Sequence, residues 1–335
     1  MDMQEFVVGV DNGNFDTKTS NEAFLSGYTT SIQKPFGVPE DSYIKWNGVY
    51  YILTQKRFPY VQDKTVDEKM AVLTLIAIAK EMEFCCKKRF EGTTHPDLFT
   101  KQMIQETTKI HLAVGLPPSH LAAQRETTEK YFHELFKNGV SYEYNGYEFS
   151  FKLGEFDIYP QNFAVVIAEG RRNKDSIMAL YDDYYTLDFG GYTLDKIAIK
   201  NRQLSMEDCD SLGEGIVTLC DKVIAKVRKD RGVTIDENNV VSVLKKKRTA
   251  LADEIVADIK EYTREWTHGV LNMVAQGGVS FQNYPVVFLG GTSLLLEEYI
   301  ESYPLLGKHE FIRNANANAD AYRKLLQNKV AANRK

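Results

Sequence analysis

The fold of this chain is decided by the stretch YYTLDFGGYTLD, Tyr184–Asp195, which has the pattern of an apolar strand, a glycine turn and a second strand. Asp188 is followed by Gly190 and Gly191, which have no side chains, so the backbone can turn tightly there and point N–H groups at an anion. Thr193 adds a hydroxyl group, and Asp195 adds a second carboxylate. The stretch therefore predicts a β-hairpin with an anion-binding turn.

Two further glycine-marked loops follow apolar strands. Near the N-terminus, the strand Phe6–Val10 ends in Asp11-Asn12-Gly13-Asn14, and the chain continues through Phe15 to Lys18. Near the C-terminus, the strand Pro285–Leu289 ends in Gly290–Ser293. Ligands of open α/β sheets bind at the carboxyl ends of strands, so the three loops predict one ligand site built from both halves of the chain.

The composition is that of a soluble globular protein. A length of 335 residues predicts about two domains. The net charge of −5 argues against a protein that coats nucleic acid, because neutralising phosphates requires a basic face. The four cysteines lack the spacing of a zinc site or a disulfide framework, and the six histidines lack metal-ligand spacing. The longest apolar stretch, Ala71–Ala79, is too short to span a bilayer, and a cytoplasmic location is expected.

Strands and helices are expected to alternate in both halves, which predicts an α/β protein. Apolar runs and Asn-Gly turns predict strands at Tyr43–Trp46, Val49–Leu53, Thr107–Leu116, Val140–Tyr144, Tyr147–Leu153 and Phe156–Tyr159. Helical periodicity and caps predict helices at Val66–Phe90, from Ser119 as the cap to Lys137, from Pro160 to Glu169, from Gly215 to Lys229, at Thr249–Gln276, Leu294–Ser302 and Ala315–Asn328. Thr29–Ser42 is expected to be a surface loop, and Arg171–Asp183 the crossing between two lobes. The basic run Lys245–Arg248 is interpreted as a solvated loop or helix start, with a nucleic-acid or lipid contact as the alternative.

Together, in this order and spacing, the three loops resemble the phosphate-1, phosphate-2 and adenosine motifs of the actin, Hsp70 and sugar-kinase superfamily. Within it, the chain most resembles bacterial and archaeal actin-like proteins of the ParM type. The stretches that carry this resemblance are VVGVDNGNFDTK (Val7–Lys18), VGLPPS (Val114–Ser119), TLDFGGYTLD (Thr186–Asp195) and VVFLGGTSLL (Val286–Leu295). The segment Ala317–Tyr322 resembles the family's final ANxxG(F/Y) helix, with Ala321 where glycine is usual.

The resemblance implies an α/β fold of the actin-like ATPase type, with two lobes that each hold a mixed sheet flanked by helices on a duplicated ribonuclease H-like core. The first domain is expected at residues 1–170, with a smaller subdomain around 30–90 and a C-terminal helix, 315–330, that returns to it. The second is expected at residues 171–314, with a subdomain around 205–280.

The resemblance also implies ATP or ADP as the ligand, with GTP possible, together with Mg²⁺. Asp11 and Asp188 would hold the metal largely through waters, as Mg²⁺ prefers. Lys18 would place a point charge on the β- and γ-phosphates, because their transfer needs positive charge and oriented donors. The residues expected to contact nucleotide are Gly13, Asn14, Phe15, Lys18, Gly190, Gly191, Thr193, Gly213, Glu214, Gly290, Gly291 and Thr292.

Two assignments carry alternatives. Gln161 resembles the actin-type glutamine that orients the attacking water, and the alternative is a polar residue in a helix's first turn. Glu214 is a candidate for the ribose hydroxyls, and the alternative is a carboxylate that stabilises the N-terminus of its own helix. Asn14 stands where relatives often have serine or threonine, and its amide can donate to a phosphate oxygen. Asp195 is expected to orient the hairpin.

The implied function is an ATPase that forms nucleotide-dependent filaments and segregates plasmid or other DNA. A separate adaptor of the ParR type would bind the DNA, so this chain would contact DNA only indirectly and would need no membrane. One alternative is a small-molecule kinase of the same superfamily, against which Lys18 and the modest length argue. A chaperone ATPase of the Hsp70 type is less compatible, since no peptide-binding β domain follows the last expected helix.

Overall fold

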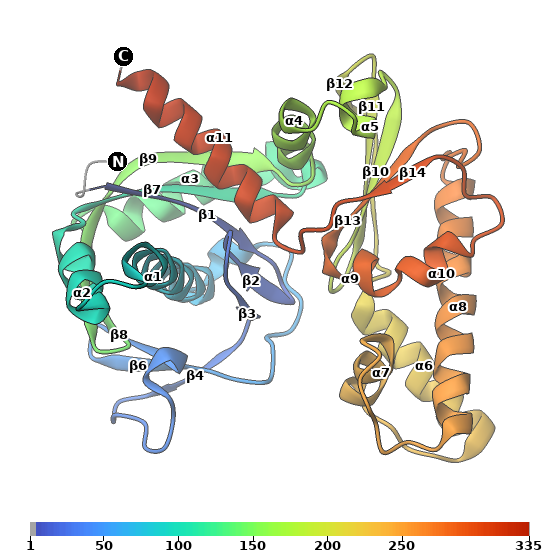
Figure 1. The fold of residues 1–335 in the computed structure, drawn as a ribbon, viewed down its shortest axis with the longest axis horizontal. Coiled ribbons are helices and arrows are strands. Elements are labelled where there is room, and N and C mark those ends of the chain that lie inside the picture. Colours follow the sequence, from blue (N-terminus) through green and yellow to red (C-terminus); the bar gives the residue numbers. More distant parts are fainter. Residues whose placement is uncertain (1–4, 335) are drawn as a thin grey trace. The chain divides into compact units, whose positions relative to one another are not determined.

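The computed structural model describes residues 5–334 and divides the chain into two compact units (Figure 1). Unit 1 joins the chain up to Ala168 with the segment from Asn316 onward, and unit 2 is Glu169–Ala315. The helix α4 (Phe163–Arg172) begins in unit 1 and ends in unit 2. Each unit has its own sheet and its own helices.

Unit 1 contains one mixed sheet with strand order β3-β2-β1-β7-β9-β8-β5-β6-β4. Its strands are β1 (Glu5–Asn12), β2 (Asp16–Lys18), β3 (Ala23–Leu25), β4 (Tyr28–Ser31), β5 (Tyr43–Trp46), β6 (Val49–Leu53), β7 (Lys109–Leu116), β8 (Val140–Tyr144) and β9 (Tyr147–Pro160). Its helices are α1 (Lys69–Phe90), α2 (Pro96–Glu106), α3 (Pro118–Phe136) and α11 (Ala317–Asn333), with short 3₁₀ turns at Glu40–Ser42 and Lys64–Val66. β1, β7 and β9 are parallel, so their carboxyl ends lie at the same edge of the sheet.

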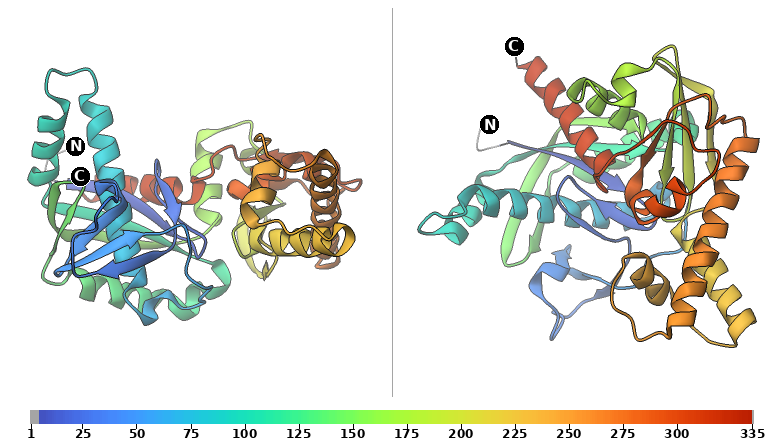
Figure 2. Two further views of the ribbon diagram at one scale, coloured as in Figure 1. Left: turned by 90° about the horizontal axis from the view of Figure 1, so that it is seen from below. Right: turned by 45° about the vertical axis from the view of Figure 1, so that its right-hand side comes forward.

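The helix α1 runs through the core of unit 1. Every residue of Met70–Ala79 is buried, so the helix is covered on all sides, whereas the periodicity predicted one buried face. Beyond Ala79 it continues beside α2, and the two helices lie side by side in the left view of Figure 2. A helix that is apolar all round belongs in the interior.

The C-terminal helix α11 packs directly against β1 and β7 of unit 1. A Cβ added at Gly9 would collide with the backbone of α11 at Ala319, and one added at Gly115 would collide with the Tyr322 ring. Ala319 and Ala321 are themselves buried. Small residues on both elements therefore bring the end of the chain onto the strand that carries the first glycine loop.

Unit 2 contains a five-stranded mixed sheet within the described residues, in the order β12-β11-β10-β13-β14. Its strands are β10 (Tyr184–Phe189), β11 (Leu194–Lys200), β12 (Gln203–Leu212), β13 (Val286–Leu289) and β14 (His309–Phe311). Its helices are α5 (Ile177–Leu180), α6 (Ile216–Arg231), α7 (Glu237–Leu244), α8 (Asp253–Gln276), α9 (Gly290–Leu295) and α10 (Glu297–Glu301). α6 packs against both α7 and α8, and the right view of Figure 2 shows α6 and α8 side by side.

Several sequence expectations for unit 1 are wrong. The expected loop Thr29–Ser42 begins in the strand β4, which pairs with β6, and ends in the 3₁₀ turn Glu40–Ser42. Ser119 does not cap α3, because Pro117 is the N-cap residue and Pro118 the first helical residue, a position that proline favours. Tyr147–Pro160 is one strand instead of two, and a register shift against β7 accommodates Gly154-Glu155.

Other expectations for unit 2 are also wrong. Arg171–Asp183 is not a plain crossing, since it contains the end of α4 and the helix α5. Gly290–Ser293 is not a loop, because α9 begins at Gly290 directly after β13. The basic run Lys245–Arg248, in contrast, is an exposed turn after α7, which agrees with the predicted solvated loop, and Lys246 forms an ion pair with Glu298. Among residues 5–334, no helix is both long and apolar enough to cross a membrane.

His111 on β7 is a buried histidine whose protonation should destabilise unit 1. Its Nδ1 accepts a hydrogen bond from the Glu155 backbone N–H (2.9 Å), so its Nε2 carries the proton that faces Glu5 Oε2 at 3.2 Å. Burial, with a smaller contribution from Lys109, lowers the pKa of His111. The unfolded chain therefore binds a proton at higher pH than the folded chain, so stability is full above about pH 6.5 and is lost as the pH falls.

The measurement is the urea midpoint of unfolding between pH 7.5 and pH 5. We expect His111→Gln to flatten its dependence on pH, whereas the exposed His133→Gln should leave that dependence unchanged. Equal pH dependence in wild type and His111→Gln would contradict this prediction.

Candidate functional site

The first glycine loop is the turn of the β1–β2 hairpin in unit 1. Asp11 at the end of β1 lies opposite Lys18 on β2, so the hairpin places the predicted metal carboxylate beside the predicted phosphate lysine. The turn closes with a hydrogen bond from Gly13 N to Asp11 O of 3.0 Å. A Cβ at Gly13 would collide with the carbonyl oxygen of Asp16, so this turn requires glycine.

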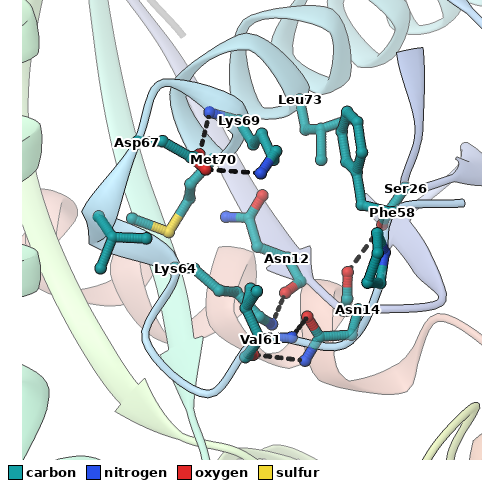
Figure 3. Close-up of a pocket in the computed structure, with 13 residues that line it drawn as sticks. Asn12, Asn14, Ser26, Phe58, Val61, Lys64, Asp67, Lys69, Met70 and Leu73 are labelled. Atoms are coloured by element: carbon teal, nitrogen blue, oxygen red, sulfur yellow. Dashed lines mark hydrogen bonds and ion pairs between the residues drawn. The ribbon is translucent and has the colours of Figure 1, made fainter.

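Asn14 is held by the segment that precedes α1. Its Nδ2 donates to Val61 O (3.0 Å), and its Oδ1 accepts from Val61 N (3.3 Å), as Figure 3 shows. Lys64 donates from the same segment to the carbonyl oxygen of Asn12. The side-chain amide of Asn14, which was predicted to contact phosphate, therefore also holds the Val61 segment against the hairpin. No sequence pattern predicts this contact.

A small cavity of about 30 Å³ lies between this segment and the hairpin (Figure 3). Asn12 borders it and is 6% exposed, and its Nδ2 has no hydrogen-bond partner among the described residues. The remaining lining is largely apolar, including Phe58, Met70 and Leu73. The cavity is about large enough for one water molecule.

Gln161 lies beside Asp11 at the carboxyl end of β1. Its Nε2 donates to Asp11 Oδ1 at 3.0 Å, although the two residues are far apart in the sequence. Pro160 is the last residue of β9 and not part of a helix, and α4 begins only at Phe163. Gln161 is therefore in the turn between them, and its amide reaches the carboxyl end of β1.

The second glycine loop is the turn of the β10–β11 hairpin in unit 2. Gly190 N donates to Thr193 O at 2.8 Å, and Asp188 lies opposite Asp195 in the ladder. Asp195 accepts hydrogen bonds from the hydroxyls of Thr193 (3.1 Å) and Ser211 (2.5 Å). These contacts tie Asp195 to the hairpin and to β12.

The third glycine segment, Gly290–Ser293 in the first turn of α9, packs against the second loop within unit 2. Gly290 has φ +84°, and a Cβ there would overlap Asp188 Oδ1 and lie 2.7 Å from Phe189 O. The Thr292 hydroxyl donates to Gly190 O at 3.2 Å. The two glycine segments therefore form one surface around Asp188, with Gly291 next to Gly290 in the first turn of α9.

The N-terminal end of α6 also contacts the second loop. The carbonyl oxygens of Gly190 and Gly191 accept hydrogen bonds from Ile216 N (3.2 Å) and Val217 N (3.0 Å). Glu214, which follows Gly213, forms an ion pair with Lys222 (2.9 Å) and accepts from Trp266 Nε1 (3.2 Å). Glu214 thus has partners on α6 and α8, and it does not cap α6, whose N-cap residue is Gly215.

A single carboxylate at a strand end is the kind of protein ligand that Mg²⁺ takes together with waters and phosphate oxygens. Within residues 5–334, no three His, Cys, Asp or Glu side chains cluster as a complete metal cage. Asp11 and Asp188 instead offer one carboxylate in each unit, each at a strand end beside a glycine turn. Mg²⁺ commonly keeps several waters and takes only one or two protein carboxylates.

Sequence reasoning missed several contacts around the first hairpin. Arg57 lies over the Phe15 ring, 4.5 Å from its centroid. Val61 and Lys64 come from a segment with no motif, so no local signal could identify them. Asn318, in contrast, lies in the Ala317–Tyr322 segment singled out above and contacts the residue after Gln161.

Comparisons with known proteins were made at three levels. No protein-family model matches the chain, and no curated protein sequence shows significant similarity to it. Many solved structures resemble it. The archaeal actin homologue Ta0583 in complex with ADP is 16% identical with a TM-score of 0.67, over 96% of this chain and 99% of that one.

Two bacterial structures are similar to the same degree. A 15-stranded ParM filament from Clostridium botulinum is 14% identical with a TM-score of 0.68, over 97% of this chain and 99% of that one. Bacillus thuringiensis ParM with ATP is 10% identical with a TM-score of 0.65, over 98% of this chain and 100% of that one. The chain therefore has the actin-like α/β fold, which it shares with ParM proteins and an archaeal actin homologue.

Proposed function

We propose that this chain binds and hydrolyses ATP and polymerises into nucleotide-dependent filaments. The observation that carries the proposal is the hydrogen bond from Gln161 Nε2 to Asp11 Oδ1, which joins a neutral amide to a carboxylate at the glycine turn of the first hairpin. The solved structures with the same fold support it, since they include proteins bound to ADP and ATP and a ParM filament.

Each residue has a role that follows from its position. Gln161 can donate and accept hydrogen bonds without carrying charge, so it can orient a water for attack on the γ-phosphate. Lys18, opposite Asp11, would contribute a positive charge to the phosphates. The turns at Gly13-Asn14 and Gly190-Gly191 would present the backbone N–H groups of Asn14 and Gly191 to the phosphates, because Gly13 N and Gly190 N donate within their own turns. Thr193 would donate its hydroxyl to a phosphate only on giving up its hydrogen bond to Asp195. Gly290, Gly291 and Thr292 would let the backbone of α9 approach the adenosine.

Asp11 and Asp188 are the residues that would hold Mg²⁺. The ion, when bound, would neutralise charge on the β- and γ-phosphates. The acidic side chains need fixed positions to do this, and the structure supplies them: Gln161 fixes Asp11, and Gly290 leaves room for Asp188.

We extend the proposal to a cellular role in DNA segregation. An acidic chain of this fold is suited to move DNA through an adaptor of the ParR type without binding DNA itself, in the cytoplasm. GTP is a possible alternative to ATP, because no side chain has been assigned to the nucleotide base.

The test of the catalytic role is Gln161→Ala. We expect this variant to release phosphate from ATP about 100-fold more slowly, because general acid–base and water-orienting groups contribute 10²–10⁴-fold. Its dissociation constant for ATP should stay near the wild-type value, since Gln161 acts on the water and not on the nucleotide. Single-turnover phosphate release and calorimetric ATP binding are the measurements.

Gln102→Ala, which removes an exposed glutamine of α2, is the matched control and should behave as wild type. Unchanged phosphate release in Gln161→Ala would remove Gln161 from the mechanism. ATP consumption that appears only when a sugar or an acid is added would identify the chain as a small-molecule kinase instead.

A further inference from the structure

Gln161 is followed by an asparagine that is bound by the C-terminal helix. Asn162 N donates to Asn318 Oδ1 at 2.8 Å, and Asn318 Nδ2 donates to Asn162 Oδ1 at 3.3 Å. Asn318 is the second residue of α11, in the segment Ala317–Tyr322. This reciprocal pair joins two parts of unit 1 that are 156 residues apart in sequence.

The backbone of Asn162 has the conformation of a tight, left-handed turn. Its φ is +62°, its side chain is fully buried, and its Nδ2 has no hydrogen-bond partner among the described residues. Asparagine tolerates this region better than most residues do, but the conformation must still be held by its surroundings. Asn318 supplies two hydrogen bonds that hold it.

The same turn fixes the direction of the Gln161 side chain. Gln161 N donates to Leu116 O at 2.9 Å, which ties the residue to β7 on one side. On the other side, the backbone N–H of Asn162 donates to Asn318 Oδ1. Between these two anchors the Gln161 amide reaches Asp11. If Asn162 left its present conformation, the Gln161 side chain would turn away from Asp11.

The helix that carries Asn318 is itself rigidly placed on the strand that carries Asp11. Gly9 of β1 has no room for a Cβ against the backbone of α11, and Arg323 Nε of α11 donates to Ser20 Oγ at 2.8 Å, just beyond β2. α11 thus contacts β1 and the turn after β2, and Asn318 at its N-terminal end contacts the Gln161 turn.

We propose that Asn318 is a positioning residue that holds Gln161 in its hydrolytic orientation through Asn162. This inference rests on the proposed ATPase function. It gives the N-terminal turn of α11 a role in ATP turnover.

The test compares Asn318→Ala with Asn318→Asp in the full-length chain. Asn318→Ala removes the acceptor for Asn162 N–H, and we expect single-turnover phosphate release from ATP to fall about 10-fold or more, with ATP affinity kept. Asn318→Asp keeps an acceptor oxygen, and rotation of the Asn162 amide would let its Nδ2 donate to the carboxylate, so this variant should recover most of the rate. Asn328→Ala, at an exposed position of the same helix, is the control.

A double-mutant cycle distinguishes positioning from a general loss of stability. Gln161→Ala combined with Asn318→Ala should be no slower than Gln161→Ala alone, because Asn318 acts only through Gln161. Asn162→Gly, which suits the φ of +62° but deletes the side chain, is a second probe and should also slow phosphate release.

The outcomes separate this inference from the proposed function. If Gln161→Ala slows phosphate release while Asn318→Ala and Asn162→Gly turn over at the wild-type rate, the inference is overturned and the ATPase proposal stands. Additive losses in the double variant would also overturn it, since they would show independent effects. If Gln161→Ala does not change phosphate release, Gln161 has no role in hydrolysis, and the inference about Asn318 is overturned with it.

Discussion

Replacing Gly290 with alanine is expected to reduce ATP turnover about 100-fold, because a displacement of 1 Å at a catalytic group can cost that much. The added Cβ would overlap Asp188 Oδ1, so the carboxylate would have to leave its place. It would also lie 2.7 Å from the carbonyl oxygen of Phe189, which is backbone and cannot rotate away. The φ of +84° adds a strain of about 1–2 kcal/mol for a residue with a side chain.

The matched control for Gly290→Ala is Gly232→Ala. Gly232 ends α6 with φ +68°, and a Cβ there would have no atom within 4 Å. This variant should lose only about 1 kcal/mol of stability and keep its ATP turnover. Phosphate release and thermal unfolding of both variants are the measurements. If both variants lost stability equally and kept full turnover, Asp188 would have no role in hydrolysis.

Replacing Glu81 with alanine is expected to destabilise unit 1 by about 3 kcal/mol, because buried donors would be left without an acceptor. Glu81 lies on α1 and is fully buried. Its Oε2 accepts from Thr19 Oγ1 (2.5 Å) and Asn21 N (3.1 Å), and its Oε1 accepts from Asn21 Nδ2 (2.7 Å). These bonds fix the turn that directly follows Lys18, so weaker ATP binding should accompany the loss of stability.

Urea unfolding and calorimetric ATP binding would measure both effects. Glu126→Ala is the control, since Glu126 is exposed on α3 and pairs with Lys130 one turn away. Surface pairs of this kind contribute little, so the urea midpoint of this variant should stay near that of wild type. A Glu81→Ala variant as stable as wild type would mean that the Thr19–Asn21 turn is held by other contacts.

The turns of the two Asn-Gly hairpins could be predicted to the residue. Asn47 and Gly48 both have positive φ, as do Asn145 and Gly146. The strands β5, β6 and β8 begin and end where the alternation of apolar residues places them, and β9 begins at the predicted Tyr147. The turn residues and the side-chain pattern specify the same structure at these positions. Local sequence was therefore sufficient.

Edge strands and strand irregularities could not be predicted. β12, QLSMEDCDSL, has no buried residue and lacks the apolar alternation that identifies a strand, and its place depends on pairing with β11. β9 contains Gly154, which reads as a break in the sequence, but the packing of Gly154 against His111 keeps the strand continuous. Tertiary contacts therefore determine both the place of β12 and the continuity of β9.

The strand-end positions of the candidate residues could be predicted, and the contacts between them could not. The positions of Asp11, Lys18 and Asp188 near strand ends follow from the glycine-marked turns. The hydrogen bond between Gln161 and Asp11 joins residues 150 apart, and that between Asn14 and Val61 joins residues 47 apart. Such contacts depend on the packing of whole elements, and no local pattern encodes them.

The central claim is that ATP drives assembly of this chain and that its hydrolysis reverses it. The most direct measurement is pelleting and light scattering of the purified protein with Mg²⁺ and ATP, with ADP, and without nucleotide. We predict scattering that rises on addition of ATP, decays as phosphate is released and is absent in Asp188→Ala. A protein that binds ATP yet stays monomeric at high concentration under all three conditions would contradict the account.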